Sequence, residues 1–142
     1  MLYRVGPINI SYEYVSRYHR DLDGVYRPYV PIRITYNGIA TDKLALVDSG
    51  ADLPTFPRTI AEILRIDLDE LPRGESRTAG GPIASWRCEC ELTTLPGIQE
   101  KCLVAIVDNE DCPYLLGRKP FFSLMQVGFR ESRLEFYLTP EP

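Results

Sequence analysis

Two carboxylates that follow a short apolar run are the residues of this chain best placed to do chemistry. Leu44 to Val47 is apolar, Asp48 follows at once, and Asp52 comes soon after. An apolar run of this length bounded by turn residues predicts a buried strand, and Gly50 allows a sharp turn after it. We therefore expect Asp48 to lie half buried at the end of a strand. A carboxylate is unfavourable there unless it has a role.

The tripeptide Asp48-Ser49-Gly50 also has an ordinary interpretation, because Asp, Ser and Gly are the commonest turn-forming residues. Two later stretches bear on the choice. Residues 78–83 read Thr-Ala-Gly-Gly-Pro-Ile, which is typical of a glycine-rich hairpin tip, and residues 115–118 read Leu-Leu-Gly-Arg. In this order, the three stretches resemble the active-site loop, the flap and the second motif of retropepsin-like aspartic proteases. The length resembles that of the stand-alone cellular or prokaryotic members of that family.

The resemblance implies a fold and a domain organisation. The expected fold is mostly β, a small closed β barrel of the retropepsin (acid protease) type with one or two short helices. The chain of 142 residues has the size of one domain. The resemblance covers residues 30–138, so residues 1–29 form an N-terminal extension and residues 139–142 a frayed tail.

The resemblance also implies roles for particular residues. Asp48 is the catalytic carboxylate, the Ser49 hydroxyl braces two such loops against each other, and the Gly50 backbone approaches both the water and the substrate. The residues implied to contact the substrate are Ala51, Asp52, Gly80, Gly81, Pro82 and Ile83. Next to Gly117, Arg118 is implied to brace the active loop by holding the Asp52 carboxylate with its guanidinium fork. The resemblance implies no metal and no other cofactor.

Aspartic proteases need two carboxylates that share one proton, because both cannot ionise at close range. This chain has one Asp-Ser-Gly loop and is too short for two lobes. The resemblance therefore implies a homodimer in which the two copies of Asp48 meet at a twofold axis. The expected function is an aspartic endopeptidase acting on a polypeptide in extended form. The alternative is a catalytically silent module of the same fold that dimerises and binds peptides. Asp48 favours the enzyme, since a binder does not need two carboxylates forced together.

Composition and charge exclude other classes of function. The net charge of −4 argues against a nucleic-acid partner, which normally requires a basic face. No apolar stretch approaches the ~20 residues of a membrane span, and residues 1–15 lack the apolar core of a signal peptide. We therefore expect a cytoplasmic protein that binds neither nucleic acid nor membrane.

The four cysteines are expected to be structural. Cys88 and Cys90 alternate with glutamates, and a period of two places both on the buried face of a strand, as small hydrophobic residues. The Cys-X-Cys spacing and the single histidine argue against zinc. A cross-strand disulfide between Cys90 and Cys102 is conceivable in a hairpin, although a reducing compartment disfavours it.

Hydrophobic periodicity and turn residues predict the remaining elements. Ile8, Ile10, Tyr12 and Tyr14 indicate a strand in the tyrosine-rich extension, which either covers the core or contacts another subunit. Asn37-Gly38 predicts a hairpin. The other expectations are a loop at 17–24, a helix within 58–66, a loop at 67–74, a flap at 77–84, strands at 83–95 and 101–107, a short helix at 120–125, and a hairpin over 126–138.

Overall fold

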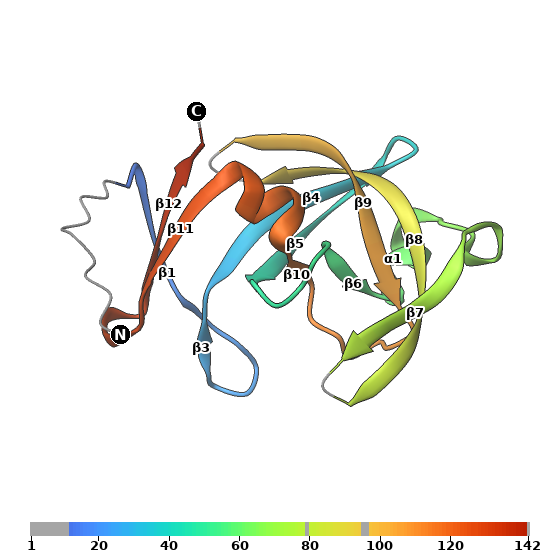
Figure 1. Ribbon diagram of the computed structural model, residues 1–142, viewed down its shortest axis with the longest axis horizontal. Helices are drawn as coiled ribbons and strands as arrows, with labels where there is room; N and C mark the ends of the chain where they lie inside the picture. The colour runs from blue at the N-terminus through green and yellow to red at the C-terminus, as the bar shows by residue number, and fades with distance from the viewer. Residues whose placement is uncertain (1–11, 79, 95–96, 142) are drawn as a thin grey trace, which may run out of the picture.

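Strands make up most of the structure, a computed structural model that describes residues 12–78, 80–94 and 97–141. Helices within these residues are short: α1 Thr59–Leu64, η1 Leu68–Glu70, η2 Arg118–Phe122 and η3 Glu131–Arg133. The strands are β1 Tyr14–Arg17, β2 His19–Arg20, β3 Tyr26–Arg27, β4 Tyr29–Tyr36, β5 Ile39–Val47, β6 Thr55–Pro57, β7 Arg73–Thr78, β8 Gly81–Thr94, β9 Ile98–Val107, β10 Leu115–Leu116, β11 Met125–Arg130 and β12 Glu135–Pro140. The prediction of a mostly β fold is confirmed (Figure 1).

The main sheet closes on itself. Its strands follow the order β4-β5-β10-β6-β9-β8, and β8 pairs again with β4. This closure is possible because β8 serves two partners along one edge. Its residues 81–86 pair with β7, and its residues 91–94 pair with β4, while the other edge pairs with β9. The predicted closed barrel is therefore confirmed.

Alternating side chains on the strands build the core inside this ring. In β4, Val30, Ile32 and Ile34 are buried, whereas Pro31 and Arg33 are exposed, as a period of two requires. Helix α1 adds three buried side chains to the same core. The largest fully buried side chains include Phe56, Phe121, Phe136, Ile106 and Leu116.

The hairpin predicted at Asn37-Gly38 joins β4 to β5. Both residues have positive φ angles, 47° and 81°, which is the backbone geometry that favours Asn-Gly in tight hairpins.

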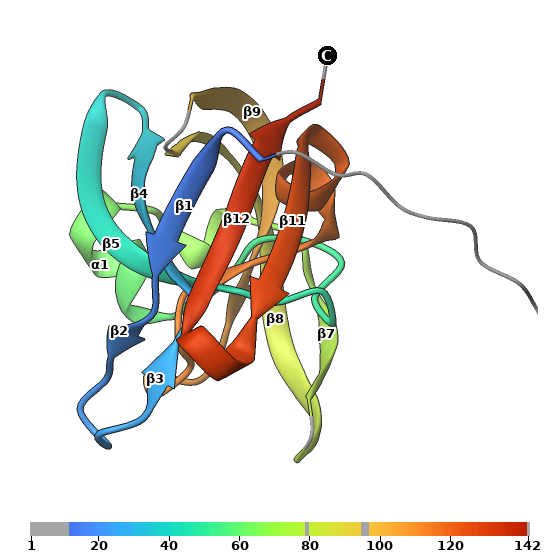
Figure 2. The same ribbon diagram turned by 90° about the vertical axis from the view of Figure 1, so that its left-hand side faces the viewer.

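A second sheet of three strands joins the two ends of the described chain. β12 pairs with β11 on one edge and with β1 on the other, and Figure 2 shows the three strands side by side. β12 continues to Pro140, which lies opposite Met125, so Thr139 and Pro140 belong to a strand rather than to the predicted frayed tail. Of the strand predicted over 8–14, only Tyr12 to Tyr14 lie among the described residues.

The polar segment predicted as a loop at 17–24 contains β2, which pairs with β3. A side chain organises this hairpin. The Asp21 carboxylate accepts the backbone N–H groups of Asp23 and Val25, both at 3.0 Å, and forms an ion pair with Arg27. Similarly, the loop predicted at 67–74 contains η1 and the start of β7.

The cysteines are free thiols, and Cys88 and Cys90 are buried in the core as predicted. Cys102 lies directly opposite Cys90 in the β8–β9 pair. Burial raises the pKa of the Cys102 thiol to about 11, so little of this side chain is thiolate at neutral pH.

No helix in the described part of the chain combines the length and the apolar character that a bilayer crossing requires.

Candidate active site

The end of β5 and strand β10 bring two distant sequence motifs together. The two strands pair in parallel, with Leu116 opposite Val47. The backbone N–H of Asp48 donates to the Leu116 carbonyl oxygen over 3.0 Å. Because parallel neighbours end at the same edge of a sheet, residues 48–52 and residues 117–119 leave the barrel side by side.

The Asp48 carboxylate is half buried and oriented by its own loop. Its Oδ1 accepts a hydrogen bond from the backbone N–H of Gly50 at 2.8 Å, and the backbone carbonyl oxygen of Asp48 accepts one from the N–H of Ala51 at 3.3 Å. A Cβ atom at Gly50 would lie 3.1 Å from Oδ1, so a larger residue would crowd the carboxylate. Within the described residues, Oδ2 of Asp48 has no hydrogen-bond partner. The loop thus fixes one carboxylate oxygen and leaves the other available to a water or a substrate.

Backbone atoms of the second motif hold this loop in place. The N–H of Arg118 donates to the Ala51 carbonyl oxygen at 2.8 Å, and the N–H of Lys119 donates to the Asp52 carbonyl oxygen at 3.1 Å. This approach requires glycine at position 117. A Cβ atom there would lie 2.6 Å from the Ala51 carbonyl oxygen, which no side chain tolerates without a shift of the backbone.

A hollow of about 780 Å³ opens beside the Asp48 loop. Asp48, Gly50, Ala51 and Asp52 line it from the loop, and Ile83 lines it from the hairpin of β7 and β8. The hollow therefore gathers five of the residues predicted to be catalytic or to contact the substrate.

Comparison with known proteins agrees with this geometry. Residues 30–119 match the family model described as aspartyl protease. The chain belongs to the aspartyl protease family. In structure it is similar to a retropepsin-like aspartic protease from Rickettsia conorii, with a TM-score of 0.61 and 17% sequence identity over 88% of this chain and 98% of that one. This likeness shows that the fold is retropepsin-like. The sequence search of curated proteins found no match.

The structure of this aspartyl protease family member lacks one expected contact. The ion pair predicted between Arg118 and Asp52 is not found among the ion pairs of the described residues. Both side chains are exposed, where a salt bridge contributes only ~0–1 kcal/mol. The link between the two motifs is made by their backbones instead.

The predicted flap corresponds to the hairpin of β7 and β8, which begins at Arg73, earlier than expected. Thr78 pairs with Gly81 at its tip, and the Thr78 hydroxyl donates to the Gly81 carbonyl oxygen over 2.8 Å. Gly81 has φ of +108°, which favours glycine. Gly80, Gly81 and Pro82 do not line the hollow, and neither do Ser49, Gly117 and Arg118.

Charged residues that the sequence interpretation did not assign to the site also line the hollow. They are Glu75, Arg77, Arg87 and Asp111. A signal for Arg87 exists in the sequence, because it lies an even number of positions from Ile83 and so shares its strand face.

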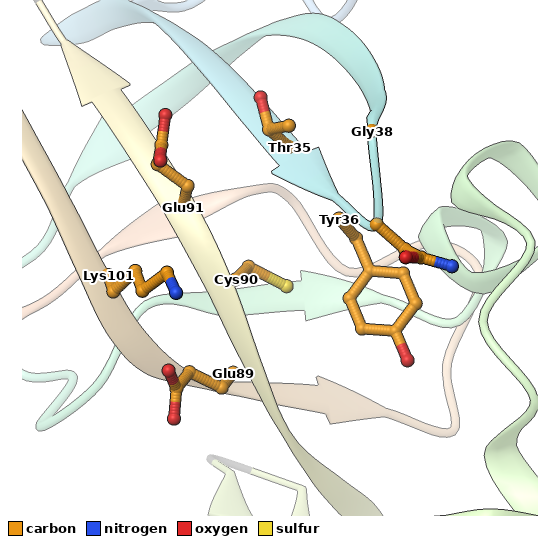
Figure 3. A pocket seen from close by; sticks show the side chains of 8 residues that line it. Thr35, Tyr36, Gly38, Glu89, Cys90, Glu91 and Lys101 are labelled. Atoms are coloured by element: carbon orange, nitrogen blue, oxygen red, sulfur yellow. The ribbon is translucent and has the colours of Figure 1, made fainter.

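A second hollow, of about 530 Å³, lies between the tip of the β4–β5 hairpin and β8 (Figure 3). It shares no residue with the Asp48 hollow, and its lining includes Tyr36, Glu89, Cys90, Glu91 and Lys101. None of the residues predicted to act in catalysis lines it. The Asp48 hollow is therefore the candidate active site.

Proposed function

We propose that this protein is a homodimeric aspartic endopeptidase that hydrolyses peptide bonds in extended polypeptides. The observation that carries the proposal is the Asp48 carboxylate, which is oriented by the Gly50 N–H and opens into the hollow beside the β7–β8 hairpin. Membership of the aspartyl protease family supports hydrolysis of a peptide bond as the reaction.

Two carboxylates share the chemistry in this proposal. One Asp48 carboxylate takes a proton from a water, whose oxygen attacks the peptide carbonyl carbon, while the protonated Asp48 of the partner subunit donates its proton to the carbonyl oxygen. The resulting gem-diol collapses when one of its hydroxyls gives a proton to the unprotonated Asp48 carboxylate, while the protonated Asp48 gives its proton to the amide nitrogen. The C–N bond then breaks and the free amine leaves. The pair of carboxylates ends with one shared proton, as it began, so the dyad is ready for the next cycle.

The need for a second chain follows from the count of such loops. The sequence holds one Asp-Ser-Gly loop, and the dyad requires two, so a twofold axis must supply the other. The exposed Ser49 and the half-buried Asp48 leave the loop accessible to a second copy.

The N-terminal extension is the proposed dimer contact. In Figures 1 and 2, the β2–β3 hairpin and the tip of the β7–β8 hairpin extend toward the same end of the molecule. Leu22, Val25 and Tyr26 lie on or beside the β2–β3 hairpin, and all three are exposed, Leu22 fully so at 106%. A partner subunit would bury this apolar group, and tyrosine is favoured at such interfaces.

The β7–β8 hairpin is the proposed flap. Its tip residues Gly80, Gly81 and Pro82 would close over the peptide and exclude bulk water, while Ile83 would contact a substrate side chain. Ala51 and Asp52 would contact the peptide from the opposite side of the hollow.

Hydrolysis of a mixture of unfolded proteins tests the proposal. Wild-type protein should cleave them, and Asp48→Asn should reduce cleavage by at least ~10³-fold, because the neutral amide can neither accept nor share the proton. The control is Asp69→Asn, which removes the same charge from the exposed turn η1 and should leave the rate unchanged. Equal rates for Asp48→Asn and wild type would contradict the proposal. Peptide binding by the wild type without cleavage at any pH between ~3 and ~8 would favour the silent module.

A further inference from the structure

Arg87 is a half-buried cation in the wall of the Asp48 hollow that has no carboxylate partner among the described residues. It lines the hollow from β8. The ion pairs among the described residues use Arg27, Arg33 and Arg58, and none of them involves Arg87. Fully buried arginines almost always have a partner, and a half-buried arginine whose free donors face a hollow can bind an anion from outside the chain. The anionic partner of Arg87 is therefore expected to belong to a molecule that enters the hollow.

Two serines fix one end of its guanidinium. Nη1 of Arg87 donates to the Ser85 hydroxyl at 3.0 Å and lies 3.5 Å from the Ser76 hydroxyl, which in turn donates to Ser85 at 2.9 Å. Ser85 is fully buried, so this anchor is shielded from water. Within the described residues, Nε and Nη2 of Arg87 have no hydrogen-bond partner, which leaves one edge of the planar fork open.

The surroundings of Arg87 suit a side chain that enters from the hollow. Arg87 lies opposite Ala105 on β9, and Ser85 lies opposite Val107. Directly paired residues share a face of a sheet, so Ile83, Ala105 and Val107 form an apolar wall beside the guanidinium. The small Ala105 leaves room next to Arg87, and the apolar wall strengthens its attraction to an anion.

We propose that Arg87 determines specificity by binding a carboxylate of the substrate peptide through the open edge of its guanidinium. The inference rests on the proposed peptidase function and names the class of substrate, peptides with an Asp or Glu at one fixed distance from the cleaved bond. A guanidinium fork matches a carboxylate with two parallel hydrogen bonds. The other carboxylates that line the hollow, Asp48, Asp52, Glu75 and Asp111, repel an acidic side chain elsewhere. Arg77, the other cation in the lining, is exposed to water on β7, where its attraction to an anion is screened more strongly. The strongest preference is therefore expected at the Arg87 subsite.

Paired peptides test this inference. In a cleavable peptide, each position in turn carries either Glu or Gln, which have nearly the same shape. For wild type, Glu should raise kcat/KM at one position by about tenfold, mainly through a lower KM, as a charge-assisted hydrogen-bond pair implies. Arg87→Gln should remove the preference and Arg87→Lys should keep part of it, because lysine retains the charge without the fork. Arg65→Gln, at the end of α1, is the control for the loss of one positive charge and should keep the full preference.

The carboxylate has two possible sources, a side chain or the C-terminus of the peptide. Cleavage of each peptide with a free and with an amidated C-terminus separates them. If amidation abolishes the difference in kcat/KM between wild type and Arg87→Gln while the Glu-to-Gln change does not, the bound group is the terminal carboxylate. If the Glu-to-Gln change alone abolishes it, the bound group is the side chain. Either result supports carboxylate binding at Arg87.

Binding measurements separate a failure of this inference from a failure of the peptidase function. Fluorescence anisotropy of labelled Glu and Gln peptides with Asp48→Asn requires no turnover, and it should show about tenfold tighter binding of one Glu peptide. The double variant Asp48→Asn/Arg87→Gln should lose this difference. Peptide cleavage with equal kcat/KM for Glu and Gln at every position, and for free and amidated C-termini, would overturn the inference and leave the peptidase function standing. Selective binding of a Glu peptide without any cleavage by the wild type would support carboxylate binding at Arg87 and contradict the peptidase function.

Discussion

At the scale of single residues, backbone atoms hold the candidate active site together. The family resemblance implies that the Arg118 side chain braces Asp52 by holding its carboxylate with the guanidinium fork. The structure instead shows Arg118 and Lys119 donating their backbone N–H groups to the loop. A sequence identifies side chains, but it does not show which backbone atoms will meet. The more informative residue is Gly117, since only a residue without a side chain permits the contact.

Replacement of Gly117 tests this brace. Gly117→Ala should lower the free energy of unfolding by about 1–3 kcal/mol, because the new methyl group collides with backbone oxygens that have little freedom to move. Urea unfolding measures the change. Gly74→Ala is the control, since a Cβ atom there meets nothing within 4 Å. Arg118→Ala, which keeps the backbone N–H, should lose less stability than Gly117→Ala. A larger loss for Arg118→Ala would mean that the side chain is the brace.

At the scale of elements, local signals predicted most of the fold. The Asn37-Gly38 turn and the helix predicted within 58–66 depend on residues close in sequence, and each agrees with the structure. The 14-residue strand β8 was divided in the prediction into a flap arm and a separate strand. The strand is continuous because β9 pairs with one of its edges, while β7 and β4 pair with successive parts of the other edge. Such pairing joins distant residues, and no local pattern reveals it.

The tip of the β7–β8 hairpin provides a prediction at this scale. Gly81→Ala should strain the hairpin tip, because φ at this position is +108°, a conformation that alanine rarely adopts. We expect peptidase kcat/KM to fall more than the melting temperature suggests, since the tip would lose its closed conformation over the substrate. Gly38→Ala is the matched control, because its φ of +81° imposes a similar strain at the tip of the β4–β5 hairpin, outside the lining of the Asp48 hollow. Equal kcat/KM in the two variants would mean that the tip does not act on the substrate.

Tyr18, between β1 and β2, provides a second prediction for an element. Its N–H donates to the Leu134 carbonyl oxygen and its hydroxyl donates to the Glu131 carboxylate, both at 2.7 Å. Burial, followed by the hydrogen bond and the charge of Glu131, raises the Tyr18 pKa to about 12. The folded state thus favours the protonated phenol. Its stabilising effect is complete below pH 10, the pKa of a free tyrosine, and is lost as the pH rises from 10 to about 12.

Tyr18→Phe should therefore lower the free energy of unfolding at pH 8 by about 1 kcal/mol. It should also make the loss of stability between pH 10 and 12 less steep than in the wild type. Urea unfolding at pH 8 and pH 11 measures both effects. If the two proteins show the same pH dependence, Tyr18 does not form this hydrogen bond in solution.

At the scale of the whole molecule, the proposed chemistry depends on a second subunit. The barrel places a single Asp48 in its hollow, and the proposed chemistry needs two such carboxylates. The sequence implied this requirement through the count of its motifs, and it left open whether the N-terminal extension covers the core or contacts the partner. Of the exposed apolar residues near the β2–β3 hairpin, Leu22 belongs to the segment predicted as a loop at 17–24. The hairpin itself was missed because the Asp21 side chain that organises it leaves no periodic pattern.

Subunit mixing tests the shared dyad most directly. Wild type and Asp48→Asn are combined in equal amounts, allowed to exchange subunits fully, and assayed on a cleavable peptide. Random pairing leaves only ~1/4 of the dimers with two intact Asp48 residues. Activity per wild-type chain should therefore fall to about half of its value before exchange. Undiminished activity per wild-type chain after complete exchange would show that each chain acts alone, and would contradict the account.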